Sequence, residues 1–170
     1  MGINEFNQGL PLIYMIGKSE TAVEVGLLIR KLLEWGNIRP KIIMSDCAQV
    51  YSLIIKQLLP NTRHLHCAWH IYRAWSNKLK SIYGKDHFKA KLQALIKIQK
   101  EVDHTKFNLS LLEFLSSSKL KFQQYFEKFY MNEIPKWASC MRLSCGINVN
   151  MHLESFHRLL KREFLKSKKH

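Results

Sequence analysis

Apolar and turn-forming residues alternate along the first two thirds of the chain in a pattern that predicts strands and helices in turn. The apolar run at residues 10–17 follows a turn-like Asn-Gln-Gly and predicts a strand, with a fragment of its hairpin partner before the turn. A capping pattern begins at Ser19, and the apolar residues after it recur at helical spacing as far as Gly36. This stretch is therefore predicted to be a helix.

The same order of strand and helix then occurs twice more. Residues 41–45 predict a strand, and Asp46 opens a predicted helix that runs to the breaker Pro60. Residues 63–67 predict a third strand, which leads into a helix over residues 68–83. Strands that alternate with helices pair in parallel through helical crossovers, so this part of the chain predicts an α/β sheet.

From Lys85 onward the apolar residues follow helical spacing alone, and convincing strand patterns disappear. We therefore expect an α/β core over residues 1–84 and 146–170, with an all-helical insertion over residues 85–145. The final predicted helix covers about residues 150–167 and ends in a basic tail.

Composition adds a preference for a polyanionic partner. The chain has 170 residues and a formal net charge of +14, and a surplus that large favours phosphate neutralisation with release of counterions. No run approaches the roughly 18 apolar residues that a membrane span needs, and the start lacks the pattern of a secretory signal. We expect an intracellular protein whose four cysteines are reduced thiols.

Two acidic residues are candidate metal ligands, and each has a structural alternative. Asp46 stands directly beyond a predicted strand, at the carboxyl end where open α/β sheets bind ligands, but Asp is also a common helix N-cap. Glu154 shares a face of the last predicted helix with Arg158 and Lys161. The same spacing is typical of a charge pair that stabilises a helix. The residue pattern alone leaves both alternatives open.

Cys67 and His70 form a Cys-x-x-His pair on one side of the first turn of a predicted helix, where both could bind zinc. A structural zinc site needs four ligands, and the other candidates show no second short-spaced pair of the usual kind; they are His64, His66, Cys47, Cys140 and Cys145. We favour the alternative that Cys67 lies in a buried stripe with His70 hydrogen-bonded beside it. The other members of that stripe would be Ile71, Trp75, Leu79 and Ile82.

A set of aromatic residues could stack on bases in a DNA-binding groove. Aromatic residues at helical spacing usually pack inward, so a place in the core is the favoured prediction. The set comprises Trp69, Trp75, Trp137, Tyr125, Phe126, Phe129 and Tyr130.

Two segments together resemble the Mutator-like element (MULE) transposases, particularly the animal versions. They are DCAQVYSLIIKQLLPNTRHLHCAWHIYRAW, at residues 46–75, and NVNMHLESFHRLLK, at residues 148–161. In that family an Asp follows a strand, a helix leads to a proline, and the next strand ends in Cys-x-x-His. An Asn-rich turn with Glu-Ser-Phe and a later Lys follows a helical insertion. Residues 3–20 also resemble the family's early hairpin, so the resemblance covers almost the whole chain.

The resemblance implies an RNase H-like (DDE transposase) core that performs metal-dependent DNA cleavage and strand transfer. Asp46 matches the second catalytic acid and Glu154 the third, and Cys67 and His70 match the Cys-x-x-His motif. The implied cofactor is a pair of Mg²⁺ or Mn²⁺ ions, which carboxylates hold roughly 4 Å apart for in-line attack on a phosphodiester. The first acid of the family lies on a strand before the hairpin, so we expect this chain to hold an incomplete core that is inactive alone.

The resemblance also implies a nuclear location, DNA as the partner and a homo-oligomer for the full-length parent, and the chain's composition predicts no membrane partner. The basic residues expected to contact DNA are Arg158, Lys161, Arg162 and Lys166. Two alternatives remain beside a transposase fragment. One is a domesticated or decayed remnant that binds DNA without catalysis, and the other is a zinc-binding module built on Cys67 and His70.

Overall fold

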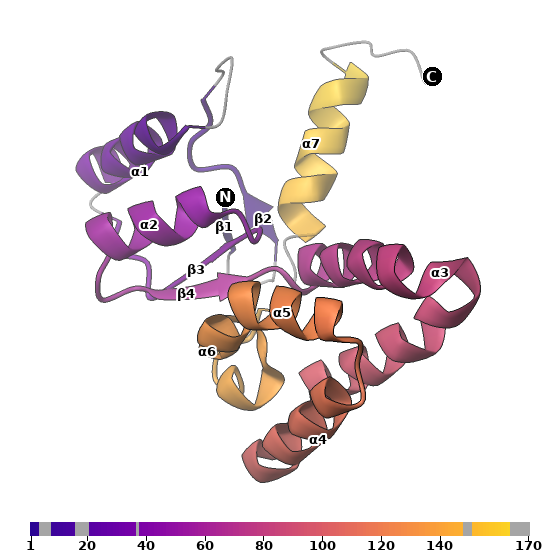
Figure 1. The fold of residues 1–170 in the computed structure, drawn as a ribbon. Coiled ribbons are helices and arrows are strands. Elements are labelled where there is room, and N and C mark those ends of the chain that lie inside the picture. The colour runs from indigo at the N-terminus through magenta and orange to yellow at the C-terminus, as the bar shows by residue number, and fades with distance from the viewer. Residues whose placement is uncertain (4–7, 16–20, 37, 148–150, 164–170) are drawn as a thin grey trace. The chain divides into compact units, whose positions relative to one another are not determined.

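A computed structural model describes residues 1–3, 8–15, 21–36, 38–147 and 151–163 of the chain, and most of these are helical (Figure 1). The chain divides into two compact units, each with its own apolar core. The first unit comprises Met1–Ile43, Ala48–Arg63 and Val149–His170, and the second comprises Met44–Cys47 and His64–Asn148. None of the described helices combines the length and apolarity that crossing a membrane requires. The predicted division into a core and an insertion stays a prediction.

The first unit begins with a short antiparallel hairpin. Strand β1 (Gly2–Ile3) pairs with β2 (Gly9–Leu10), with Gly2 opposite Leu10. The hairpin is where the sequence predicts it, but the strand predicted over residues 10–17 ends at Leu10, and residues 16 and 17 lie outside the described part. Pro11 has no backbone N–H to donate to a ladder, which explains why the strand stops there.

Two helices form the core of the first unit. Helix α1 (Ala22–Gly36) packs on α2 (Gln49–Leu58) through a small buried cluster made by Val25, Ile29, Ile55 and Leu59. The cap of α1 is the Thr21–Glu24 capping box, in which the Glu24 carboxylate accepts from the Thr21 backbone N–H at 3.0 Å. Ser19, the predicted cap, lies outside the described residues. Helix α7 (Met151–Glu163) also belongs to this unit.

Strands β3 (Ile42–Ser45) and β4 (Arg63–His66) form a two-stranded sheet. The Arg63 N–H donates to the Lys41 carbonyl at 2.9 Å, and the Cys67 N–H donates to the Ser45 carbonyl at 2.8 Å. Both partners advance by four residues in the same direction, so the two strands are parallel, as predicted.

The prediction of a larger parallel sheet is wrong for the described residues, because β2 pairs with β1 and does not join β3. A two-residue strand that ends at a proline offers too short a ladder to extend the sheet. The chain is a mixed α/β protein that is mostly helical. The RNase H-like core stays a prediction.

The second unit is helical apart from its strand ends. Its longest element, α3 (Ala68–Lys100), is interrupted at Gly84, whose φ of 81° is a conformation that side chains disfavour. The chain changes direction at this glycine (Figure 1). The following helices are α4 (His104–Ser116), α5 (Leu120–Phe129) and α6 (Ile134–Trp137), with 3₁₀ turns at Met131–Glu133 and Ser139–Met141.

An aromatic cluster forms the centre of the second unit. The rings of Trp75 and Trp137 meet edge to face with centroids 5.4 Å apart, and the ring of Phe126 lies 5.9 Å from that of Trp75. The Trp137 indole N–H donates to the Tyr130 carbonyl at 2.9 Å, so its polar atom is paired inside the core. The prediction that these aromatic residues pack inward is confirmed for all four.

Two other members of the predicted aromatic set do not pack inward. Trp69 is 46% exposed and Phe129 is 42% exposed. Trp69 lies only six residues before Trp75 on the same helix, but on a side that no described apolar cluster covers.

We predict a large difference in stability between two substitutions on α3. Trp75→Ala should lower the free energy of unfolding by about 3–5 kcal/mol, because it leaves a cavity among fully buried rings. Trp69→Ala should change it by no more than about 0.5 kcal/mol, because the ring is already half in solvent. Urea unfolding of both variants tests this, and similar losses would contradict the assignment of the core.

Candidate functional site

The carboxyl ends of β3 and β4 bring together the residues that the sequence singles out around Asp46 and Cys67. In a parallel pair these ends lie at one edge of the sheet, so Asp46, which follows β3, and Cys67, which follows β4, are neighbours in the second unit. The alternative that Asp46 caps α2 is wrong. Helix α2 begins at Gln49, and its N-cap is Ala48, which makes no side-chain cap hydrogen bond.

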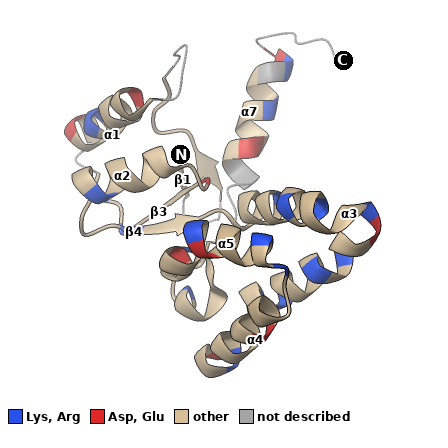
Figure 2. Cartoon of the chain, viewed as in Figure 1, with Lys and Arg blue, Asp and Glu red and all other residues tan. Residues whose placement is uncertain are grey.

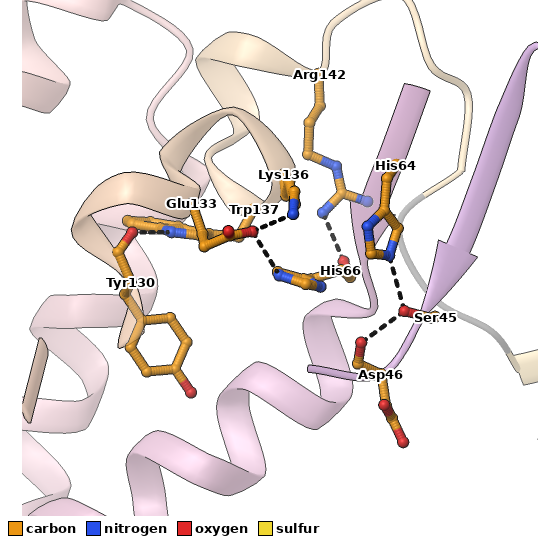
Figure 3. Close-up of polar contacts among 9 residues, drawn as sticks. All are labelled: Ser45, Asp46, His64, His66, Tyr130, Glu133, Lys136, Trp137 and Arg142. Carbon is orange, nitrogen blue, oxygen red and sulfur yellow. Dashed lines mark hydrogen bonds and ion pairs between the residues drawn. The ribbon is translucent and has the colours of Figure 1, made fainter. Parts of the chain in front are cut away.

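A chain of hydrogen bonds fixes the backbone of Asp46. The Ser45 hydroxyl donates to the Asp46 carbonyl at 2.7 Å and lies 2.8 Å from His64 Nε2 (Figure 3). A hydroxyl has one hydrogen, and the carbonyl can only accept it, so His64 donates from Nε2 to the Ser45 oxygen. The Asp46 carboxylate points away from both imidazoles (Figure 3).

His64 is a neutral imidazole at ordinary pH. Burial lowers its pKa from 6.5 to about 3, and the neighbouring His66 and Lys136 act in the same direction. The rings of His64 and His66 meet edge to face with centroids 5.2 Å apart, so a charge on one ring would oppose a charge on the other. A neutral ring with its proton on Nε2 fits the hydrogen bond to Ser45.

His66 anchors a second set of polar contacts. Its ring is almost completely buried, and its Nε2 lies 3.3 Å from a carboxylate oxygen of Glu133, which also pairs with Lys136 (Figure 3). Burial and the Lys136 charge lower the pKa of His66, while Glu133 opposes them. The buried guanidinium of Arg142 donates to the His66 carbonyl at 3.1 Å and to the Ile147 carbonyl at 3.0 Å. These contacts form a buried polar network inside the second unit.

The thiols at this edge are buried or half-buried, which makes them poor candidates for nucleophiles. Burial, followed by the nearby Asp46 charge, raises the pKa of Cys47 to about 12, so its thiol keeps its proton. Cys67 is fully buried in line with Ile71, Trp75 and Leu79, which is the stripe that the sequence predicts. The His70 ring stands edge to face against Trp69 at 4.8 Å.

Within the described part of the chain, no group of three His, Cys, Asp or Glu side chains has an arrangement that could hold a metal ion. A zinc module built on Cys67 and His70 therefore gains no support. The two acids of the resemblance lie in different units, Asp46 in the second and Glu154 in the first, so a shared metal site stays a prediction.

The basic residues implied to contact DNA all fall near the end of the chain. Arg158 and Arg162 are exposed on α7, and the Arg162 side chain pairs with Glu163 at 2.6 Å. Lys161 also lies on α7, and Lys166 lies outside the described residues. Their role as DNA contacts stays a prediction.

The polar network contains residues that the sequence did not identify. Glu133 and Arg142 were missed, because their partners lie far away along the chain: Arg142 and His66 are 76 residues apart. The contact between His64 and His66 could have been predicted from the sequence. Residues i and i+2 of a strand point to the same face, so His64 and His66 were bound to be neighbours once β4 was recognised.

We predict that the polar network makes the second unit acid-sensitive. An unfolded chain binds a proton at His64 below about pH 6.5, whereas the folded chain binds one only near pH 3. The contribution of a neutral His64 to the free energy of unfolding is therefore fully present above pH 6.5 and is lost as the pH falls from 6.5 towards 3. His64→Gln keeps a donor towards Ser45 but cannot be protonated, so its loss of stability between pH 7.5 and 5.0 should be smaller than that of the wild type.

Urea unfolding at the two pH values measures this difference. His87→Gln, which changes an exposed histidine on α3, is the matched control and should follow the wild type. If all three proteins lose the same stability on acidification, His64 is not the group responsible.

The comparisons with known proteins do not identify the chain. No protein-family model, no curated protein and no solved structure matches this chain.

Proposed function

We propose that this chain is a transposase-derived protein of the Mutator-like kind that binds duplex DNA through the basic face of α3. The observation that carries the binding proposal is the concentration of positive charge on this one helix. The order of the motifs around Asp46 and Glu154 supports the transposase origin.

Half of the net charge of the chain lies on α3. Between Ala68 and Lys100 there are eight Lys or Arg residues and one acidic residue, Asp86, which gives a formal charge of +7 out of +14 for the whole chain. Figure 2 shows these cations on both sides of the break at Gly84. A local surplus of this size attracts a polyanion and releases the counterions bound to it.

The second half of α3 presents its lysines as a stripe. Lys85, Lys89, Lys97 and Lys100 are exposed, and their spacing places them along one side of the helix with Gln93 between them. None of these four lysines forms an ion pair with another described residue. From the first to the last, the stripe extends for about 22 Å along the helix, which is long enough to follow several phosphates.

Two other lysines of α3 are already engaged by the fold. Lys78 lies 4.9 Å from the centre of the Tyr125 ring, and Lys91 lies 5.3 Å from that of Phe114. Cations held over these rings stabilise the unit and are less free to reach phosphates. Lys78 and Lys91 therefore have a structural role, unlike the exposed lysines of the stripe.

Helix α7, which carries three of the basic residues that the sequence predicts as DNA contacts, is much less basic. Its three cationic residues are offset by Glu154 and Glu163, for a formal charge of +1. Binding energy that depends on phosphate neutralisation should therefore come mainly from α3.

For catalysis we propose Asp46 and Glu154 as the two acids that the motifs match, with Mg²⁺ as the ion they would hold together with a further carboxylate. The support is the position of Asp46 at the carboxyl end of β3, its exclusion as a helix cap, and the order of the motifs. DNA binding through α3 does not depend on this site, so a non-catalytic remnant would bind in the same way.

The binding proposal predicts that the lysine stripe carries the salt dependence. The triple variant Lys85→Gln, Lys89→Gln, Lys97→Gln should bind a 20-base-pair duplex more weakly. Its slope of log affinity against log salt should be shallower by about 2 to 3, because each lost phosphate contact removes about 0.9. Fluorescence anisotropy between about 50 and 200 mM salt measures both quantities.

The matched control removes the same charge from α4 and α5, as Lys106→Gln, Lys121→Gln, Lys128→Gln; all three lysines are exposed. This control should keep most of the wild-type slope. If both triple variants lose the same amount, binding follows net charge alone and the assignment to α3 is wrong. A pair of α7 variants, Arg158→Gln and Arg162→Gln, measures the contribution of the basic residues that the sequence predicts as DNA contacts.

A further inference from the structure

We propose that Trp69 and Tyr72, at the start of α3, form a stacking surface for unpaired bases of a DNA strand. The inference rests on the proposed function, because it assumes that DNA reaches this helix. It adds a second kind of contact, which recognises bases that are not stacked in a duplex.

The exposure of these two rings sets them apart from the buried rings of the same unit. Trp69 is 46% exposed and Tyr72 is 44% exposed, whereas Trp75 on the same helix is completely buried. Neither ring belongs to the apolar core of the second unit. Large aromatic faces left in water by a unit that buries its other tryptophans are typical of a binding surface.

The two rings share a side of α3 with cationic residues. Trp69, Tyr72 and Arg73 are related by helical spacings of three and four residues, and all three are exposed. The same side continues to Asn77 and Lys80, which are also exposed. A nucleic acid strand has a flat base and a charged phosphate in every unit, and this side of the helix offers aromatic faces followed by positive charge.

Arg73 orients the Trp69 ring of this stacking surface. Its guanidinium lies 5.4 Å from the centre of the Trp69 ring, and the same ring meets that of His70 at a right angle. These contacts hold the indole in one orientation without burying it, which reduces the entropy lost when a base stacks on it. The guanidinium also retains donors that a phosphate beside the stacked base would accept.

The stacking surface lies close to Asp46, the proposed catalytic acid. The Cys67 N–H bonds to the Ser45 carbonyl, so the first turn of α3 and Asp46 lie at the same edge of the β3–β4 pair. In duplex DNA each base face is covered by its neighbours, so the indole can stack only on a base that is frayed, flipped or single-stranded. The stacking surface would therefore bind an unpaired base next to Asp46, the residue that we propose as a catalytic acid.

The test compares one fully paired duplex with the same duplex carrying a single-stranded overhang of six thymidines. For wild-type protein the overhang should raise the affinity, and Trp69→Ala should lower the affinity for the overhang substrate about tenfold while changing the affinity for the blunt duplex less than twofold. Trp69→Phe, which keeps an aromatic face, should retain most of the preference. Leu109→Ala, at a 64% exposed apolar residue on α4, is the control and should bind both substrates as the wild type does.

A spectroscopic measurement separates stacking from a general weakening. Single-stranded thymidine added to wild-type protein should quench tryptophan emission, and Trp69→Phe should remove most of that quenching. No quenching, or equal losses on both substrates, would overturn the stacking surface while leaving duplex binding in place. The proposed function fails separately, if the blunt duplex does not bind in a salt-dependent way.

Discussion

The parallel pairing of β3 with β4 is the constraint on which the rest of the second unit depends. The bond from the Cys67 N–H to the Ser45 carbonyl, at 2.8 Å, closes the pair at its carboxyl end and fixes where α3 begins. The same register places Asp46 beside that start and brings the His64 side chain within reach of the Ser45 hydroxyl, at 2.8 Å. Only four residues long, each strand contributes little surface, so the pairing acts mainly by determining position. This register therefore makes neighbours of Asp46, the polar network and the first turn of α3.

The charge on α3 is unfavourable for the helix itself. Like charges at neighbouring positions destabilise an isolated helix, and a stripe of lysines without acidic partners adds to that cost. The helix forms because its other side is buried: Trp75 and Leu79 before Gly84, and Leu95 after it, are completely enclosed. The aromatic core thus stabilises a surface that would not be stable alone. Folding alone does not explain a surface that lowers the stability of its own helix, and a polyanion is the kind of partner that would relieve this repulsion.

The sequence predicted the elements whose signals are local. Helical spacing and short β-rich runs were enough to predict α1, β3, α2, β4 and the helical stretch after Lys85. The prediction went wrong at residues 10–17, where the apolar pattern outweighed the missing N–H of Pro11, and at Asp46, which stands two residues before the cap of α2. The helix predicted over residues 68–83 ends directly before Gly84, where α3 is interrupted, so the sequence also placed this break. Glu133 and Arg142 were out of reach, since their burial against His66 exists only after residues far apart in the sequence have packed.

Catalysis and binding impose different requirements on this chain. Two-metal chemistry requires carboxylates that converge to within a few ångströms, and it is lost when one ligand is absent. Binding through phosphates needs only a stable surface with unpaired cations, and each cation contributes a separate part of the affinity. Helix α3 and the core beneath it meet the second requirement within one unit, from Trp69 at its start to Lys100 at its end. On the proposed function, DNA binding through α3 therefore does not require the two-metal site, because charge and aromatic surface are concentrated on one helix of the second unit.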